Sequence, residues 1–155
     1  MGRRKARNDP APDPRDFEVP FIGHRLRETY NAWVRRSEKE FAQFGITTTM
    51  SLVLIRLWLE EAITQKELVE HTALMQSGTS SVLKRLIRQG FIVGKAGLTD
   101  GREMRYSLTP KGEALVLKVA PVALDIRKRA LQGLDPKDVR QVQEILGHIK
   151  GNLGS

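Results

Sequence analysis

The architecture depends most on one stretch, residues 64–90, which reads TQKELVEHTALMQSGTSSVLKRLIRQG. Thr64 and Glu67 have the spacing of a capping box, in which each side chain accepts a hydrogen bond from the other residue's backbone N–H. This spacing predicts a short helix that begins after Thr64 and ends near His71. Residues 72–75 lack helical periodicity, and we expect them to form a turn.

A second helix is expected from Gln76 to Gln89, and Gly90 is suited to end it. The apolar side chains that this pattern directs inward are Val82, Leu83, Leu86 and Ile87. Two short helices joined by a turn of a few residues form a helix-turn-helix unit.

The hydrophobic period changes after Gly90. Residues 91–93 and 104–108 read as two short strands, and the segment between them contains the turn residues Gly97, Asp100 and Gly101. A hairpin directly after a helix-turn-helix is a wing, which we place at residues 91–108.

Helices are expected on both sides of this unit. Upstream, a long helix that ends at Gly45 carries the stripe Ile22, Leu26, Tyr30, Trp33, Ser37, Phe41 and Phe44. A mostly apolar helix follows over about residues 49–61, and we expect it to be buried on most sides. Downstream, Thr109-Pro110 and Asp135-Pro136 each pair an N-cap residue with a first-turn proline and predict two further helix starts. Pro121 is expected to bend the first of these helices.

The last helix carries an apolar stripe that one short helix cannot bury alone: Val139, Val142, Leu146, Ile149 and Leu153. We therefore expect a partner helix from a second copy of the chain, and hence a homodimer.

Length and charge point to one domain with a polyanionic partner. The 155 residues suit a single domain, and the net charge is +8. Residues 76–111 hold seven Lys/Arg against two Asp/Glu, a net of +5, whereas residues 1–16 form a Pro-rich basic segment that reads as a flexible arm. A basic block of this kind is typical of nucleic-acid binding, and a merely solvated basic surface is the alternative.

Several classes of protein are excluded or disfavoured. The chain has no cysteine, which excludes disulfide scaffolds, thiol catalysis and zinc fingers. No apolar run reaches the roughly 18–20 residues of a membrane span, and the charged N-terminus does not read as a secretory signal, so we expect a cytoplasmic protein without a membrane partner. His24, His71 and His148 lack metal-ligand spacing, and no catalytic motif is present. We expect no enzyme, no cofactor and no metal site.

The order of these elements resembles the MarR family of bacterial transcription regulators over about residues 20–150. The wing and its exit, DGREMRYSLTPKG (100–112), are similar to the family's D-x-R and L-T-x-x-G pattern, and GIT (45–47), TQKEL (64–68) and LIRQGF (86–91) support the resemblance. It implies a mainly α fold with a small β wing. Residues 17–155 would form one domain, with a winged helix-turn-helix at 46–109 and dimerisation helices at 17–45 and 110–155.

The resemblance implies a homodimer that binds a palindromic operator in double-stranded DNA. The recognition helix would offer Ser77, Gly78, Thr79, Ser80 and Ser81 to the major groove, with ordinary helix capping as the alternative for these residues. Lys84, Arg85 and Arg88 would contact phosphates or form a solvated helix face. Arg102 would enter the minor groove from the wing, held by Asp100, unless the two are a solvated arginine and a turn residue. Ser81 departs from the basic residue that the family often has at this position.

The family also encloses a small-molecule pocket that often takes anionic aromatic compounds. The residues implied here are His24, Arg25, Tyr30, Trp33 and Arg56. The alternative is that the two arginines form intersubunit ion pairs and that Trp33 packs in the core. The expected function is a sequence-specific regulator, most simply a repressor released by a small anionic aromatic ligand or its thioester. The alternatives are a winged-helix DNA-binding protein without an effector and a winged-helix protein–protein interaction module.

Overall fold

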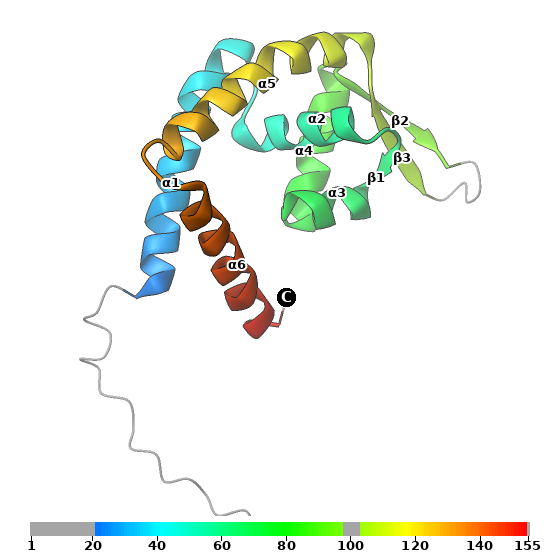
Figure 1. Ribbon diagram of the computed structural model, residues 1–155. Helices are drawn as coiled ribbons and strands as arrows, with labels where there is room; N and C mark the ends of the chain where they lie inside the picture. Colours follow the sequence, from blue (N-terminus) through cyan, green and yellow to red (C-terminus); the bar gives the residue numbers. More distant parts are fainter. Residues whose placement is uncertain (1–20, 98–102, 155) are drawn as a thin grey trace, which may run out of the picture. The chain divides into compact units, whose positions relative to one another are not determined.

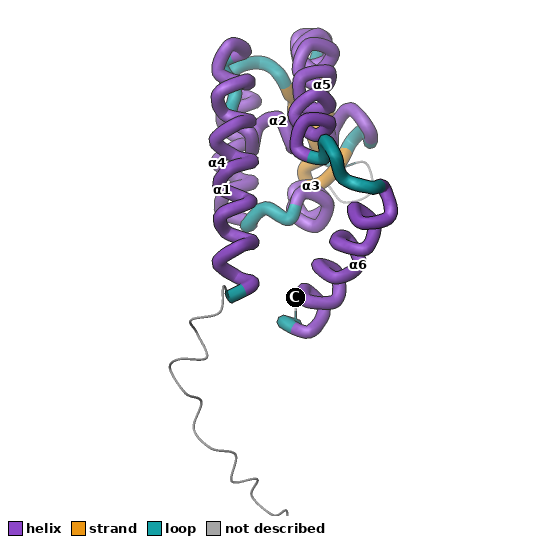
Figure 2. Tube along the Cα trace, turned by 60° about the vertical axis from the view of Figure 1, so that its left-hand side comes forward, coloured by secondary structure: helices purple, strands orange, loops and turns teal. Residues whose placement is uncertain are grey.

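The computed structural model describes residues 21–97 and 103–154, which are mostly helical (Figures 1 and 2). The elements in chain order are α1 (Ile22–Phe41), the 3-10 helix η2 (Ala42–Phe44), α2 (Thr48–Leu59), β1 (Ile63–Thr64), α3 (Gln65–Thr72), α4 (Gln76–Arg88), β2 (Ile92–Ala96), β3 (Met104–Leu108), α5 (Pro110–Ala130) and α6 (Pro136–Asn152). This order confirms the predicted class, mainly α with a small β wing. The expected basic arm, residues 1–16, lies outside the described residues. The chain divides into two compact units between Trp33 and Val34.

The helix-turn-helix begins at the predicted capping box. Thr64 Oγ1 accepts a hydrogen bond from Glu67 N at 3.2 Å, and Glu67 Oε2 accepts one from Thr64 N at 2.7 Å. These bonds satisfy two backbone donors that the first turn of a helix leaves without partners. α3 ends at Ala73, which has a left-handed backbone conformation, and α4 starts after Met75. The predicted helix-turn-helix is confirmed.

Three strands form an antiparallel sheet in the order β1-β3-β2. Ile92 pairs with Leu108 and Gly94 with Tyr106, so β2 and β3 form the predicted hairpin, which Figure 1 shows extending beside α3. β1 pairs through Ile63 with Tyr106 and is an element that the sequence pattern did not predict. The segment that joins β2 to β3 includes residues 98–102, which lie outside the described residues.

The core of the second unit collects apolar side chains from α2, α3, α4, the sheet and α5. Its fully enclosed members include Val53, Leu54, Leu68, Leu83, Leu86 and Val119. Two expectations are wrong in detail. Ile87 is 44% exposed, because the buried stripe of α4 runs through Leu83 and Leu86. The end of α2 also emerges from the core, since Trp58 and Leu59 are exposed.

α5 is fixed at its start by close contact with the hairpin. Thr109 is its N-cap and accepts a hydrogen bond from Gly112 N at 3.1 Å, and Pro110 occupies the first turn as predicted. Gly112 is buried so tightly that an added Cβ would lie 2.0 Å from Phe91 O. The helix continues through Pro121 to Ala130.

α6 contributes nothing to this core. Asp135 caps it as predicted, by accepting a hydrogen bond from Lys137 N at 2.7 Å, but α6 has no buried residue. Its larger apolar side chains are left exposed at Val142, Ile145 and Leu146. The described part of the first unit, the start of α1, also has exposed apolar side chains, namely Ile22, Leu26, Tyr30 and Trp33.

Among the described residues, no single helix is long and apolar enough to cross a bilayer. The helices on either side of Gly45 would qualify together as a bent pair, by length and composition alone.

Candidate nucleic-acid interface

α4 has one apolar face and one polar, basic face. Thr79, Leu83 and Leu86 are buried, and they recur at spacings of four and three. The side opposite this stripe is exposed and carries Ser77, Gly78, Ser81, Lys84, Arg85 and Arg88. Gln76 and Ile87 are exposed as well. No acidic residue occurs in α4. Hydroxyl groups therefore occupy the first half of this face and positive charges the second half.

Thr79 differs from the expectation for a base-contacting residue. Its side chain is completely buried, and its hydroxyl donates a hydrogen bond to Met75 O at 3.1 Å. Ser80 is half-buried. The threonine belongs to the core stripe of α4, so the prediction that its side chain contacts DNA is not supported by its position.

The C-terminal end of α4 is held by the start of α5. Lys111 Nζ donates a hydrogen bond to Gln89 O at 2.8 Å and lies 4.8 Å from the centroid of the Phe91 ring. Thr109 Oγ1 donates to Gly90 O at 2.7 Å. A cation at a helix C-terminus also compensates the partial negative charge of the last carbonyls. The sequence pattern assigned no role to Lys111, because its partner is a backbone carbonyl 22 positions away.

The base of the wing is tied to the start of α3 by Arg105. Its guanidinium donates a hydrogen bond to Ala62 O at 2.8 Å and lies 3.9 Å from Glu67 Oε2 and 3.5 Å from Glu103 Oε2. The hydrogen bonds from Thr64, aided by the charge of Arg105, lower the pKa of Glu67 below its ordinary value. Arg105 thus joins the wing to the helix-turn-helix, a role that sequence analysis missed because it depends on the β1–β3 pairing.

The two residues assigned to the wing tip, Asp100 and Arg102, lie outside the described residues. Their contact with DNA stays a prediction from the sequence pattern.

Of the residues expected to bind a ligand, His24, Arg25 and Arg56 make ion pairs with residues three or four positions away. On α1, His24 Nε2 lies 3.4 Å and Arg25 NH1 3.2 Å from the Glu28 carboxylate. Tyr30 and Trp33, also on α1, are 67% and 38% exposed. On α2, Arg56 pairs with Glu60, and its buried Nε has no hydrogen-bond partner among the described residues. Binding of a ligand by these residues stays a prediction.

Comparison with known proteins identifies the family. Residues 46–104 match the MarR family model. An uncharacterized HTH-type transcriptional regulator of Bacillus cereus is 33% identical over 104 residues, which cover 67% of this chain and 69% of that protein.

Solved structures share the fold. BpsR of Bordetella bronchiseptica, whose DNA binding is regulated by 6-hydroxynicotinic acid, is 26% identical to this chain, with a TM-score of 0.78. The match covers 86% of this chain and 95% of the BpsR chain. A MarR variant of E. coli in complex with operator DNA is 19% identical, with a TM-score of 0.77. The match covers 89% of this chain and 99% of that chain, and at this identity it is evidence for the fold only. The chain belongs to the MarR family of DNA-binding transcription regulators, whose members are not enzymes.

Proposed function

We propose that this regulator binds a palindromic operator as a homodimer and represses transcription. It would act in the cytoplasm, where its DNA target lies. The observation that carries the proposal is the exposed face of α4, which has hydroxyl groups at its N-terminal end, three positive charges further on and no acidic residue. A dimer seated on a promoter excludes polymerase by occupying the same DNA.

The dimer is supported by α6. This helix has no buried residue although Val142, Ile145 and Leu146 are apolar. A second copy would bury these side chains and relate two α4 helices by a two-fold axis, about 34–36 Å apart to match half-sites one helical turn apart.

The α4 face divides into two kinds of contact. Ser77 and Ser81 can donate or accept hydrogen bonds at base edges. Gly78 has no side chain, and the space where a Cβ would lie is open, with no atom within 4 Å, so DNA can approach the backbone closely there. Lys84, Arg85 and Arg88 are assigned to phosphates. On the sequence pattern alone, Arg102 of the wing is assigned to the minor groove and Asp100 to the hydrogen bond that holds it.

The test is a selection of genomic DNA fragments by the purified protein, followed by titration of the enriched sequence. A palindromic motif is expected, and Ser81→Ala should lower affinity for it about fivefold, the effect of roughly 1 kcal/mol from one net hydrogen bond, with little change on scrambled DNA. Arg85→Ala should weaken binding to both DNAs and reduce the salt slope by about one charge. Failure to enrich any sequence would refute operator binding.

We further propose that a small anionic aromatic compound, or its thioester, releases the repressor. The support is the relative BpsR, whose DNA binding is regulated by 6-hydroxynicotinic acid, an aromatic acid. The residues assigned to this ligand from the sequence are His24, Arg25, Tyr30, Trp33 and Arg56.

Thermal-shift screening of benzoates, cinnamates and their thioesters tests the release of DNA. A compound that stabilises the protein should also weaken operator binding about 5–150-fold, the range of typical allosteric couplings. A protein that binds its operator but responds to none of these compounds would support a regulator without such an effector.

A further inference from the structure

Met75 occupies the N-cap position of α4 but does not cap the helix. Within the described residues, its side chain makes no capping hydrogen bond. N-caps are usually Ser, Thr, Asp or Asn, whose side-chain oxygen accepts a hydrogen bond from a free backbone N–H of the first turn. The N-caps of α2, α3, α5 and α6 follow this rule, at Thr47, Thr64, Thr109 and Asp135. At the start of α4, a thioether takes the place of that oxygen, so the stabilisation that a cap provides is absent.

Met75 is also 80% exposed, the highest value of any large apolar residue that the structure describes. Leu74, the residue before it, packs against the core instead. Met75 precedes the buried Thr79 by four residues, so a helical backbone would place it on the buried stripe of α4. Its backbone is extended, with φ −69° and ψ 146°, and the side chain does not join that stripe. Packing within the chain therefore gives no reason for a large apolar residue at this position.

The backbone of Met75 is fixed to the core. Met75 O accepts hydrogen bonds from Thr79 N at 2.9 Å and from Thr79 Oγ1 at 3.1 Å, and Thr79 is completely buried. Gln65 of α3 donates a hydrogen bond to the next carbonyl, Gln76 O, at 3.4 Å. The first turn of α4 thus presents an apolar side chain from a fixed point, two residues before Ser77 of the exposed face. Such preorganisation lowers the entropic cost of binding.

The major groove of DNA offers one apolar group to a side chain of this kind. All four bases present hydrogen-bond donors or acceptors there, and only thymine adds a methyl group, at C5. A thioether has no proton to donate and is a weak acceptor, so it gains little from the polar base edges. Contact with a thymine methyl group would remove apolar surface of both partners from water.

We propose that Met75 determines operator specificity by contacting the C5 methyl group of a thymine in each half-site. This inference rests on the proposed function, in which α4 lies in the major groove. It adds to the polar contacts of Ser77 and Ser81 an apolar contact that selects thymine at one position. The missing N-cap and the exposure of Met75 then have one common explanation.

The test uses the full chain and the operator that it selects from genomic DNA, with deoxyuridine in place of each thymidine of one half-site in turn. Deoxyuridine pairs like thymidine but lacks the methyl group. Loss of the contacted methyl group should weaken binding about fourfold, the equivalent of about 0.8 kcal/mol for one buried CH₂-sized group. Met75→Ser should bind the operator less tightly and should show no difference between thymidine and deoxyuridine at this position. Met75→Leu keeps an apolar side chain and should retain the difference.

Met104→Ser is the matched control, because it removes a second exposed methionine, on β3, and should leave the response to deoxyuridine at this position unchanged. Met75→Ser also supplies a capping hydroxyl, so its urea midpoint should be at least as high as that of the wild type. A lower midpoint would show that Met75 supports the fold and would overturn the proposal.

Two other results would overturn it. One is an operator in which no thymine responds to the loss of its methyl group. The other is a response that persists in Met75→Ser, because it would then come from the shape of the DNA or from another residue. Both results leave operator binding intact and so do not affect the proposed function. A protein that selects no operator at all would refute the proposed function and this inference together.

Discussion

Replacement of Gly112 by alanine should destabilise the fold strongly. Gly112 is the third residue of α5, and a Cβ built there lies 2.0 Å from Phe91 O and 3.0 Å from Phe91 C. Both atoms are backbone, so no side-chain rotation relieves the overlap. Since real Cβ contacts essentially never fall below 3.0 Å, α5 and the start of β2 must separate by about 1 Å.

The magnitude follows from what this separation disrupts. Phe91 O accepts a hydrogen bond from Thr109 N at 3.0 Å, worth about 0.5–1.5 kcal/mol. It also lies 3.2 Å from Thr109 Oγ1, whose single proton is shared with Gly90 O at 2.7 Å. Overpacking of a buried site costs about 1–3 kcal/mol by itself. The higher helix propensity of alanine returns up to about 1 kcal/mol. Gly112→Ala should therefore lower the free energy of unfolding by about 2–4 kcal/mol, a large share of the roughly 5–15 kcal/mol of a typical domain.

Gly78→Ala is the matched control. Gly78 is also the third residue of its helix, α4, but a Cβ there meets no atom within 4 Å. This variant should gain up to about 1 kcal/mol of stability. Urea denaturation followed by circular dichroism, at one fixed protein concentration, measures both changes. If Gly112→Ala unfolds within about 0.5 kcal/mol of the wild type, α5 does not approach Phe91 as closely as described, and the reasoning is refuted.

Three further outcomes are expected. Leu146→Glu should make the protein monomeric in light scattering and abolish operator binding, because it places a charge on the exposed apolar face of α6; a wild-type monomer at micromolar concentration would contradict the proposed dimer. Arg102→Ala should cost about 1–3 kcal/mol of operator affinity, whereas Arg88→Ala should cost less and lower the salt slope by about one charge. If Arg102→Ala binds operator DNA and scrambled DNA each as tightly as the wild type does, the wing does not contact DNA. The depressed pKa of Glu67 adds stability that is present above its ordinary pKa of 4.5 and is lost as the pH falls through the lower folded value. Glu67→Gln, which removes the titrating group, should therefore flatten the acid limb of a denaturation curve, and an unchanged limb would show that folding does not depress this pKa.

Elements with local signals were predictable from the sequence. The capping box at Thr64 and Glu67, the first-turn prolines and the apolar period of α4 act within one helical turn, so the residues that specify each start are neighbours in the chain. β1 has only two residues and exists through its pairing with β3, so no periodicity could reveal it. The same pairing positions Arg105, whose partners Ala62 and Glu67 are distant in sequence.

The burial of Thr79 has a different explanation. The resemblance assigns residues 77–81, the N-terminal part of the recognition helix, to DNA as one group, whereas a helix distributes consecutive residues around its axis. Thr79 lies four residues before Leu83, which places it on the buried stripe, and Ser77 and Ser81 share the outer face. The correct division was therefore available from the 3.6-residue period.

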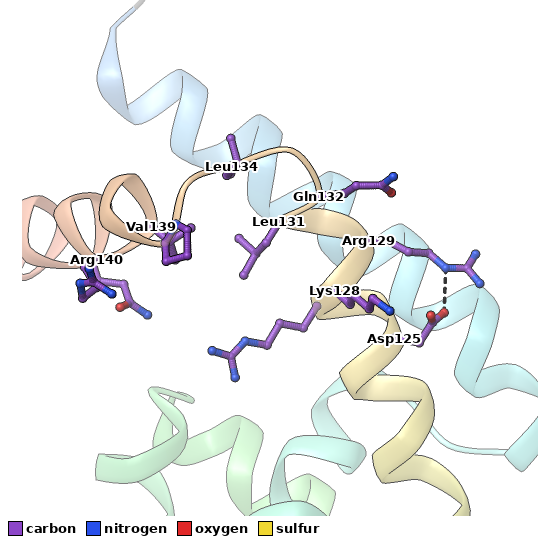
Figure 3. A pocket seen from close by; sticks show the side chains of 11 residues that line it. Asp125, Lys128, Arg129, Leu131, Gln132, Leu134, Val139 and Arg140 are labelled. Atoms are coloured by element: carbon purple, nitrogen blue, oxygen red, sulfur yellow. Dashed lines mark ion pairs between the residues drawn. The ribbon is translucent and has the colours of Figure 1, made fainter.

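α5 connects the winged helix-turn-helix to α6, the helix that we assign to the dimer. Thr109, Lys111 and Gly112 fix its start to the end of α4, and its last turn leads into α6 (Figure 3). A helix of 21 residues is about 30 Å long, so a tilt of about 3° moves one end by roughly 1.5 Å relative to the other. Shifts of about 1–2 Å are sufficient in known allosteric transitions. A ligand that displaces the last turn of α5 in a dimer would therefore change the separation of the two α4 helices, and only a ligand with different affinity for the two spacings can regulate DNA binding.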